Sequence, residues 1–238
     1  KPSFIFLIAF FLYIDGVHFS QGLAQALWLL KIFAKLSVFN QYVRPYPRNR
    51  KLMIYALFLG LVGEYFFSVY LGMYTYRLDN VPWYVPFGHA AVYARVFLFS
   101  KHHLARKYHK EIESVFSLIM IGFATVYLIF FFDVFGFVMT FFVFLLLWFR
   151  PKDRLYFYTM YLVVALLEIG GTAFGCWKWP ETAFGTFDFL PSHNPPSGIS
   201  LFYFLLDIGC FVMYALLHPK TWKRKRQLEQ LHFESAKN

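Results

Sequence analysis

Charged side chains are scarce in this sequence. Asp, Glu, Lys and Arg make up 15% of its 238 residues, whereas hydrophobic residues make up 59% and aromatic residues 24%. A soluble domain cannot bury that much apolar side chain in its core. The apolar residues also recur in runs of roughly 17 to 22, the length that a helix needs to cross a bilayer. The composition therefore argues against a soluble enzyme and predicts an all-α integral membrane protein.

Cysteine is also scarce, and familiar catalytic motifs are missing. The two cysteines, Cys176 and Cys210, have no zinc-type spacing and indicate no disulfide framework. No phosphate-binding glycine loop, Ser-His-Asp order or HExxH motif occurs. The histidines of segment 101–109, KHHLARKYH, are too few for a membrane di-iron centre, because the remaining histidines are isolated. We therefore expect no metal site, and the chemistry considered below requires no cofactor.

The net charge of +10 comes from basic residues in a few short segments. Most of the 23 lysines and arginines lie at the N-terminus, in segments 44–51, 101–110 and 150–154, and after residue 217. The alternate connecting segments, 72–82 and 176–198, carry only Arg77 and Lys178. This alternation is typical of cytoplasmic loops, and basic clusters attract anionic lipid head groups. It predicts membrane lipid rather than nucleic acid as the partner, with both termini cytoplasmic.

We predict about eight transmembrane helices. Their approximate ranges are 3–19, 22–43, 53–71, 83–100, 114–132, 134–149, 155–175 and 199–217. The first run has no small-residue cleavage site, so we expect a retained span rather than a signal peptide. The second is the weakest, because Lys31 and Lys35 lie one turn apart on one face. If that helix lies on the cytoplasmic surface, the chain has seven spans and its N-terminus lies outside.

An internal repeat favours eight spans. Glu64 precedes G-M-Y-T-Y at 72–76, and Glu168 precedes G-C-W-K-W at 175–179. Further along, segments 86–93 and 196–203 both read P-x-G-x4-Y. Two four-helix units inserted in the same direction would be related by a pseudo-two-fold axis along the membrane normal. The predicted divisions are a first repeat at 1–110, a second at 111–217 and a basic cytoplasmic tail at 218–238.

Glu64 and Glu168 are the main candidates for chemistry. Each lies in an apolar stretch near the outer end of its span. An ionised acid at the centre of a membrane helix costs about 2.5 to 3.5 kcal/mol on insertion scales, so each should be protonated, paired or in a wet cavity. An intramembrane acid is a functional candidate by default. The alternative is that each only accepts hydrogen bonds and locks the two halves together.

Several other residues belong to the predicted site. His89 could exchange a proton with a glutamate, since imidazole titrates near neutral pH, or could simply pack near a helix end. Asp207 has wholly apolar neighbours and either serves the site or pairs with Arg95. Asp15 and Asp133 are expected to cap the outer turns.

Aromatic residues near the glutamates suit either an interfacial belt or a wall that stabilises a cation through its ring faces. The aromatic candidates for substrate binding are Tyr74, Tyr76, Trp83, Trp177, Trp179 and Tyr203. Their pairing with an acid favours the second interpretation: an acid that protonates an alkene beside aromatic walls can support a carbocation.

The stretch GEYFFSVYLGMYTYRLDNVPWYVPFGHA, residues 63–90, resembles the carotenoid biosynthesis protein family of membrane hydratases. Members have a corresponding glutamate, a G-x-Y-x-Y element and a V-P-x-x-V-P-like start to the next helix. The resemblance implies an enzyme that adds water across a terminal double bond of an acyclic carotenoid. Membrane-integrated terpene cyclases use the same alkene protonation, so the resemblance leaves hydration and cyclisation open.

The leading hypothesis is a membrane enzyme that protonates an alkene of a hydrophobic isoprenoid, with Glu64 or Glu168 as the general acid. The resulting cation would be quenched by water or by an internal double bond, and the other glutamate or His89 would take the last proton. The alternative is a proton-coupled transporter or lipid-handling protein that uses the same glutamates. A third hypothesis is a scaffold in which both acids are fully hydrogen-bonded and adjoin no cavity.

Overall fold

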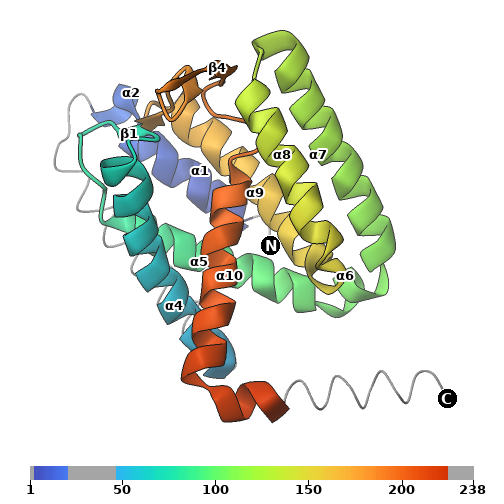
Figure 1. Ribbon diagram of the computed structural model, residues 1–238. Helices are drawn as coiled ribbons and strands as arrows, with labels where there is room; N and C mark the ends of the chain where they lie inside the picture. The colour runs from blue at the N-terminus through green and yellow to red at the C-terminus, as the bar shows by residue number, and fades with distance from the viewer. Residues whose placement is uncertain (1–2, 21–46, 225–238) are drawn as a thin grey trace.

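The computed structural model describes residues 3–20 and 47–224, and these residues are mostly helical (Figure 1). The expected second span, residues 22–43, lies outside the described residues. Each of the other expected spans coincides with a helix. The helices of these spans are α1 (Ser3–Asp15) with α2 (Val17–Ser20), α4 (Pro47–Glu64), α5 (Tyr84–Lys101), α7 (His109–Phe131), α8 (Val134–Trp148), α9 (Arg154–Ala173) and α10 (Ser200–Leu217).

Four helical segments in the described residues are long and apolar enough to cross a bilayer. They are Arg50–Tyr70, His109–Phe131, Pro151–Ala173 and Ser200–Leu217. Helix α8 is also apolar but shorter. The first segment joins α4 to the π-helix η1 (Tyr65–Tyr70), and the third joins the short 3₁₀ helix η2 (Pro151–Asp153) to α9. The chain is therefore an all-α membrane protein, as its composition predicts.

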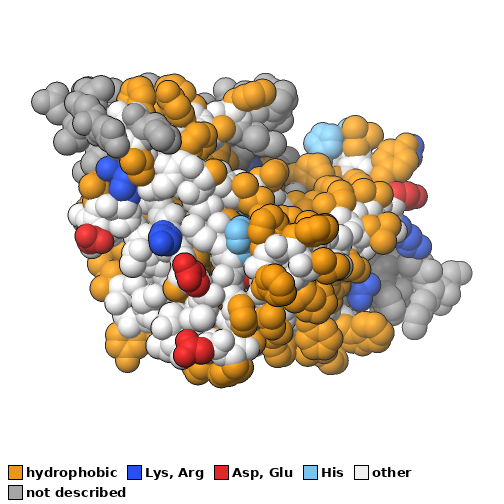
Figure 2. Space-filling view, turned by 90° about the horizontal axis from the view of Figure 1, so that it is seen from above, with side chains coloured by type: hydrophobic (Ala, Val, Ile, Leu, Met, Phe, Trp, Pro, Cys, Tyr) orange, Lys and Arg blue, Asp and Glu red, His pale blue; other side chains and the backbone are white. Residues whose placement is uncertain are grey.

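Helix α9 lies at the centre of the bundle and α7 at its edge. Of the apolar window in each segment, 61% is buried for α9 and 11% for α7. The outward side chains of α7 and α8 are large and apolar, among them Leu118, Phe130 and Phe141, which are 67%, 71% and 61% exposed. Hydrophobic side chains also cover much of the surface in Figure 2. Water would disfavour such a surface, whereas lipid chains match it.

Helices α4, α9 and α10 surround the site described below. Helix α10 contacts both α4 and α9, and α5 also contacts both. In Figure 1, α5 crosses behind α10 at a steep inclination, whereas α7, α8 and α9 run side by side. The largest fully buried side chains include Tyr93 of α5, Tyr161 of α9 and Phe204 of α10. The core therefore lies where the predicted halves meet.

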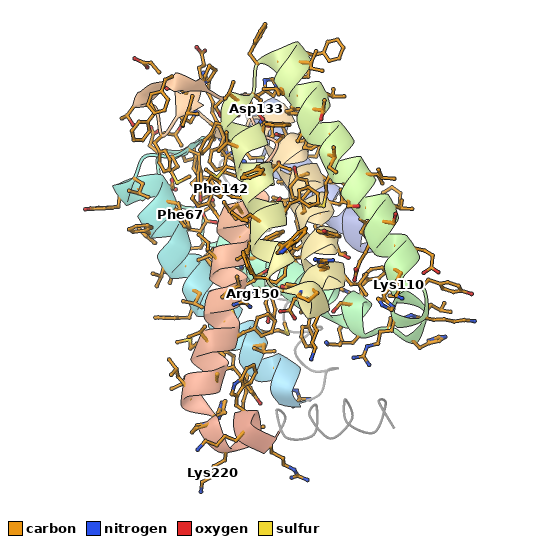
Figure 3. All side chains as sticks on the ribbon, turned by 45° about the vertical axis from the view of Figure 1, so that its right-hand side comes forward. Phe67, Lys110, Asp133, Phe142, Arg150 and Lys220 are labelled. Atoms are coloured by element: carbon orange, nitrogen blue, oxygen red, sulfur yellow. The ribbon has the colours of Figure 1, made fainter. Side chains whose placement is uncertain are left out.

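Several of the basic residues lie toward one end of the molecule. Lys110, Arg150 and Lys220 lie toward the end opposite Asp133 in Figure 3. The short helix α6 (His103–Lys107), which carries Arg106 and Lys107 in its last turn, precedes α7. This arrangement agrees with the charge alternation along the chain.

The opposite end, here called the outer end, carries four short strands. Strand β1 (Thr75–Tyr76) pairs antiparallel with β2 (Trp177–Lys178), and β3 (Thr182–Ala183) forms an irregular hairpin with β4 (Phe187–Pro191). Gly72 and Gly175 precede β1 and β2 with φ angles of 61° and 69°. Glycine tolerates this left-handed conformation because it has no Cβ. The two connections therefore turn back over the helix ends in the same way.

Asp133 caps the outer turn, as predicted, but Asp15 does not. The Asp133 carboxylate accepts hydrogen bonds from the backbone N–H groups of Gly136, His193 and Ser197, at 3.1, 3.0 and 2.7 Å. It thus joins the start of α8 to the segment before α10. Asp15 instead accepts hydrogen bonds from the side chains of Tyr84 and Arg77, the latter at 3.3 Å. Among the described residues, the donors to Asp15 are thus long-range side chains rather than the backbone N–H groups of a turn.

Candidate active site

Glu64 and Glu168 line one cavity near the outer end of the bundle, here called the chamber. It contains about 700 Å³ of space, its open mouth included. Phe67, which also lines it, lies in the half of the molecule that holds Asp133 in Figure 3. Apolar side chains form much of the rest of the wall. They include Leu12, Phe67, Leu167, Phe202 and Leu206. A hydrophobic ligand would therefore meet two acids in an apolar pocket.

Glu64 is placed by a change of helix type. It is the last residue of α4, and the next six residues form η1. A π-helical turn is wider than an α-helical one and occurs frequently at functional sites. After η1, Gly72 turns the chain so that β1 passes back over the helix end. The acid and the aromatic residues that follow it in sequence thus come together.

Two phenols hold the Glu64 carboxyl. The hydroxyl groups of Tyr74 and Tyr76 both donate to its Oε2 atom, each at 2.5 Å. Burial in the chamber wall raises the pKa of both phenols well above that of an exposed tyrosine, and the nearby glutamate adds to this effect. Both phenols therefore keep their protons at neutral pH and are available as donors.

Three donors hold the Glu168 carboxyl. The indole N–H groups of Trp177 and Trp179 donate to Oε2 at 2.8 and 3.0 Å. The Tyr203 hydroxyl donates to Oε1 at 2.8 Å.

Gly171 makes room for this arrangement, since a Cβ at that position would lie 2.0 Å from the Trp177 ring. Its neighbour Gly170 instead faces Leu12 of α1. Gly170 thus permits close packing of α9 against α1.

The β1–β2 pair brings the two acids' aromatic partners against each other. Thr75 lies opposite Lys178, and Tyr76 lies opposite Trp177. The rings of Tyr76 and Trp177 are 6.1 Å apart between centroids, and those of Tyr74 and Trp179 are 4.5 Å apart. Each tyrosine that binds Glu64 therefore packs on a tryptophan that binds Glu168. The four rings form one aromatic wall of the chamber.

A second buried polar group lies below this wall. Asp207 accepts a hydrogen bond from the Tyr156 hydroxyl at 2.8 Å, and its Oδ1 lies 3.8 Å from Nε2 of His89. The His89 ring stacks on the ring of Tyr203, with centroids 5.4 Å apart. The suggested pairing of Asp207 with Arg95 is wrong, because Arg95 is exposed on α5 while His89 and Tyr156 occupy the space around Asp207.

The other predicted site residues divide into two groups. Tyr203 lines the chamber, whereas the described lining does not include His89 or Asp207. Trp83 stands at the N-terminal end of α5 with 63% of its surface exposed, outside the lining. A catalytic role for His89 and Asp207, and a substrate contact for Trp83, remain predictions.

Sequence reasoning missed Tyr84 and Asn194. Tyr84 lines the chamber and donates to Asp15, while Asn194 Oδ1 accepts from the backbone N–H of Trp179 at 2.9 Å. Both residues stand two positions before the proline of the P-x-G-x4-Y pattern. The pattern itself does not mark them, because the two positions carry different residue types. Tyr156 was also missed, because nothing local in its aromatic segment distinguishes it from its neighbours.

The chamber is acidic and aromatic. Among the described residues, its lining holds two carboxyl groups and no Lys, Arg or His. Such a site can donate a proton and can stabilise a positive charge through ring faces and a carboxylate. In the part of the chain that the structure describes, no three His, Cys, Asp or Glu side chains come within reach of one metal ion.

Comparisons of the chain with protein-family models, with curated proteins and with solved structures found no match.

Proposed function

We propose that this protein is an integral membrane enzyme that protonates a carbon–carbon double bond of a hydrophobic isoprenoid. The observation that carries the proposal is that Glu64 and Glu168 line one chamber with four aromatic rings and an apolar wall. Alkene protonation needs an acid that is shielded from bulk water and a pocket whose side chains stabilise a cation. The resemblance of residues 63–90 to carotenoid hydratases supports the same class of substrate.

The proposal includes eight spans in two four-helix units, with both termini on the basic side. Two features support the repeat. Gly72 and Gly175, which both have positive φ, occupy corresponding positions in the two units. In the alignment of the two units, Thr75 corresponds to Lys178, and these residues face each other across β1 and β2. A two-fold axis through that pair would also relate the two Tyr–Trp ring contacts.

The reaction begins when the acid's O–H bond breaks and its proton forms a C–H bond with the terminal alkene carbon. The π electrons supply the new bond, and the adjacent carbon becomes a tertiary cation. The rings of Tyr74, Tyr76, Trp177 and Trp179 stabilise this cation. Water then adds through its oxygen, giving a hydrated product, or an internal double bond attacks, giving a ring. The proton lost in the last step returns to a chamber carboxylate.

His89 and Asp207 support this site from outside the chamber lining. His89 stacks on Tyr203, which donates to Glu168, and Asp207 lies 3.8 Å from the imidazole. We assign them to positioning Tyr203 rather than to direct contact with the isoprenoid. This assignment differs from one of the two options in the sequence-based hypothesis, in which the second glutamate or His89 takes up the final proton.

Substitution of each acid tests the proposal. Glu64→Gln and Glu168→Gln keep the shape of the side chain, and the amide oxygen can still accept from the neighbouring donors. The measurement is turnover of an acyclic isoprenoid by membranes that contain equal amounts of inserted protein. We expect at least one variant to lose turnover by 100-fold or more, on the order expected for loss of a general acid. Wild-type turnover by both variants would end the proposal.

The chamber's acidity also supports the alternative of a proton-coupled transporter or lipid-handling protein. Two acids at the meeting of two similar units would suit a binding site for protons or a cationic solute. This alternative predicts proton-dependent uptake of a solute into proteoliposomes, lost in Glu64→Gln. Co-purified lipids provide a further distinction: a bound polyisoprenoid identified by mass spectrometry would favour the enzyme.

A further inference from the structure

We infer that the two chamber acids differ in charge and role: Glu64 holds the reactive proton, and Glu168 is a fixed carboxylate. The roles in catalysis rest on the function proposed above, whereas the difference in protonation stands on geometry alone. Two ionised carboxyl groups in one apolar chamber, with no basic residue in its described lining, would repel each other. At least one of them should therefore keep a proton. The hydrogen-bond partners indicate which one.

Glu168 has partners that favour the ionised form. Indole N–H groups can only donate, so Oε2, which receives both Trp177 and Trp179, cannot carry the proton. The other oxygen, Oε1, receives the Tyr203 hydroxyl. Three donors distributed over both oxygens stabilise a negative charge. Glu168 is also 2% exposed, so this charge depends on the three bonds rather than on water.

Glu64 has partners that leave room for a proton. Both tyrosine hydroxyls donate to Oε2, and no donor among the described residues reaches Oε1. The carbonyl oxygen of a neutral carboxylic acid can accept two hydrogen bonds while its hydroxyl oxygen holds the proton. In Glu64, Oε2 is suited to be the carbonyl oxygen and Oε1 the hydroxyl oxygen. The acid can therefore release its proton without breaking a bond to its own neighbours.

This difference gives a simple proton cycle. Glu64 gives its proton to the alkene and becomes a carboxylate, while Glu168 remains charged and stabilises the cation. When water adds, the proton that it loses returns to Glu64. Hydration thus consumes one alkene and one water and restores both acids to their starting state. In cyclisation the returning proton comes from a carbon next to the final cation.

Infrared spectroscopy of the purified protein in lipid nanodiscs tests the inference without substrate. A protonated carboxyl has a carbonyl stretch separate from that of a carboxylate, and it shifts in heavy water. We expect Glu64→Gln to lose a protonated-carboxyl band that Glu168→Gln keeps. Asp207→Asn serves as the control, because it identifies any band from this neighbouring buried acid. Loss of the band in Glu168→Gln, or its retention in Glu64→Gln, would overturn the inference.

Two variants that each remove a single hydroxyl group cover the case in which Glu64→Gln does not fold. Tyr76→Phe removes one donor from the Glu64 carbonyl oxygen and should shift the band to higher frequency. Tyr203→Phe removes a donor from Glu168 and should leave the Glu64 band in place. The reverse pattern would contradict the assignment. Since no turnover is measured, failure of the isoprenoid proposal would leave this result unchanged.

Discussion

The hydrogen-bond donors of the two acids occupy matching sequence positions but differ in chemical type. Tyrosines follow Glu64 and tryptophans follow Glu168, so both acids receive donors from corresponding strands. A phenol can donate or accept, whereas an indole can only donate. Glu64 is thus free to change its charge, whereas Glu168 is held in its ionised state. The type of aromatic residue that follows each glutamate is thus enough to make the two acids chemically unequal.

At this scale, two isosteric variants should differ in stability. Tyr203→Phe removes a donor from a charged acid, which costs about 1.5–3 kcal/mol, whereas Tyr76→Phe removes one from a neutral acid, which costs about 0.5–1.5 kcal/mol. Neither change alters the ring. Unfolding in detergent, followed with increasing denaturant, measures both. A larger loss for Tyr76→Phe than for Tyr203→Phe would indicate that Glu64 is the charged acid.

Much of the residue-level site could be predicted from the repeat. The pattern of acid, glycine and two aromatic residues identified Glu64, Glu168 and their partners, because local spacing fixes which side chains reach a helix end. It did not identify Tyr156, whose role depends on α9 and α10 lying side by side. The sequence also suggested Trp83, whose side chain is mostly exposed and is not part of the described lining.

The packing of the helices and strands around the chamber depends on glycines at which neighbouring elements approach closely. Gly171 of α9 lies beneath the Trp177 ring, and Gly198, before α10, approaches the backbone of α8. A side chain at either position would push apart elements that hold a partner of Glu168. Helix α9 is therefore both the central span and the support of the aromatic wall.

Gly171→Ala should displace Trp177 from Glu168. The added Cβ would lie 2.0 Å from the ring, so we expect a loss of about 1–3 kcal/mol in stability and a change in tryptophan fluorescence. Gly122→Ala is the matched control, because its Cβ would meet nothing within 4 Å on exposed α7. Alanine should stabilise that helix by up to about 1 kcal/mol. Equal effects of the two variants would contradict the account of Gly171.

Asp133→Ala should weaken the junction between α8 and α10. Its carboxylate is fully buried and accepts from three backbone N–H groups, so the loss should be at least about 2 kcal/mol. Asp188→Ala, on the exposed part of β4, should be nearly neutral. Thermal unfolding of both proteins in the same detergent makes the comparison, and similar midpoints would show that the cap contributes little.

Helix positions could be predicted because each apolar run must match the bilayer, but the contacts of the outer end could not. The pairing of β1 with β2 depends on residues far apart in the chain meeting each other. Nothing within Y-T-Y or W-K-W alone indicates a strand partner. The sequence therefore predicts which helix ends carry the site, and the tertiary structure determines how the site closes.

For the whole molecule, the distribution of charge predicts an orientation. The basic residues labelled in Figure 3 lie toward one end, while Asp133 and the strands lie toward the other. Tyr76 of β1 and Trp177 of β2 donate to the two chamber acids. We therefore expect the chamber to open near the outer leaflet, with its apolar wall continuous with lipid-facing side chains. A hydrophobic substrate could reach it without leaving the membrane.

Cysteine labelling in sealed vesicles tests this orientation. The two native cysteines are buried and should react slowly, so single exposed cysteines can be compared. Lys107→Cys and Lys223→Cys should react from the cytoplasmic side only, and Asp188→Cys from the opposite side. An N-terminal tag should share the side of Lys223 with eight spans and lie opposite to it with seven. Labelling of Lys107→Cys and Asp188→Cys from one side would contradict the proposed topology.

The most direct test of alkene protonation is turnover in heavy water. Purified protein in lipid nanodiscs would be incubated with an acyclic isoprenoid in D₂O, and the product would be washed with H₂O and examined by mass spectrometry. We predict a product with a single deuterium bound to carbon at the protonated end of the former double bond, formed by wild-type protein but not by Glu64→Gln. A product without carbon-bound deuterium would contradict the account.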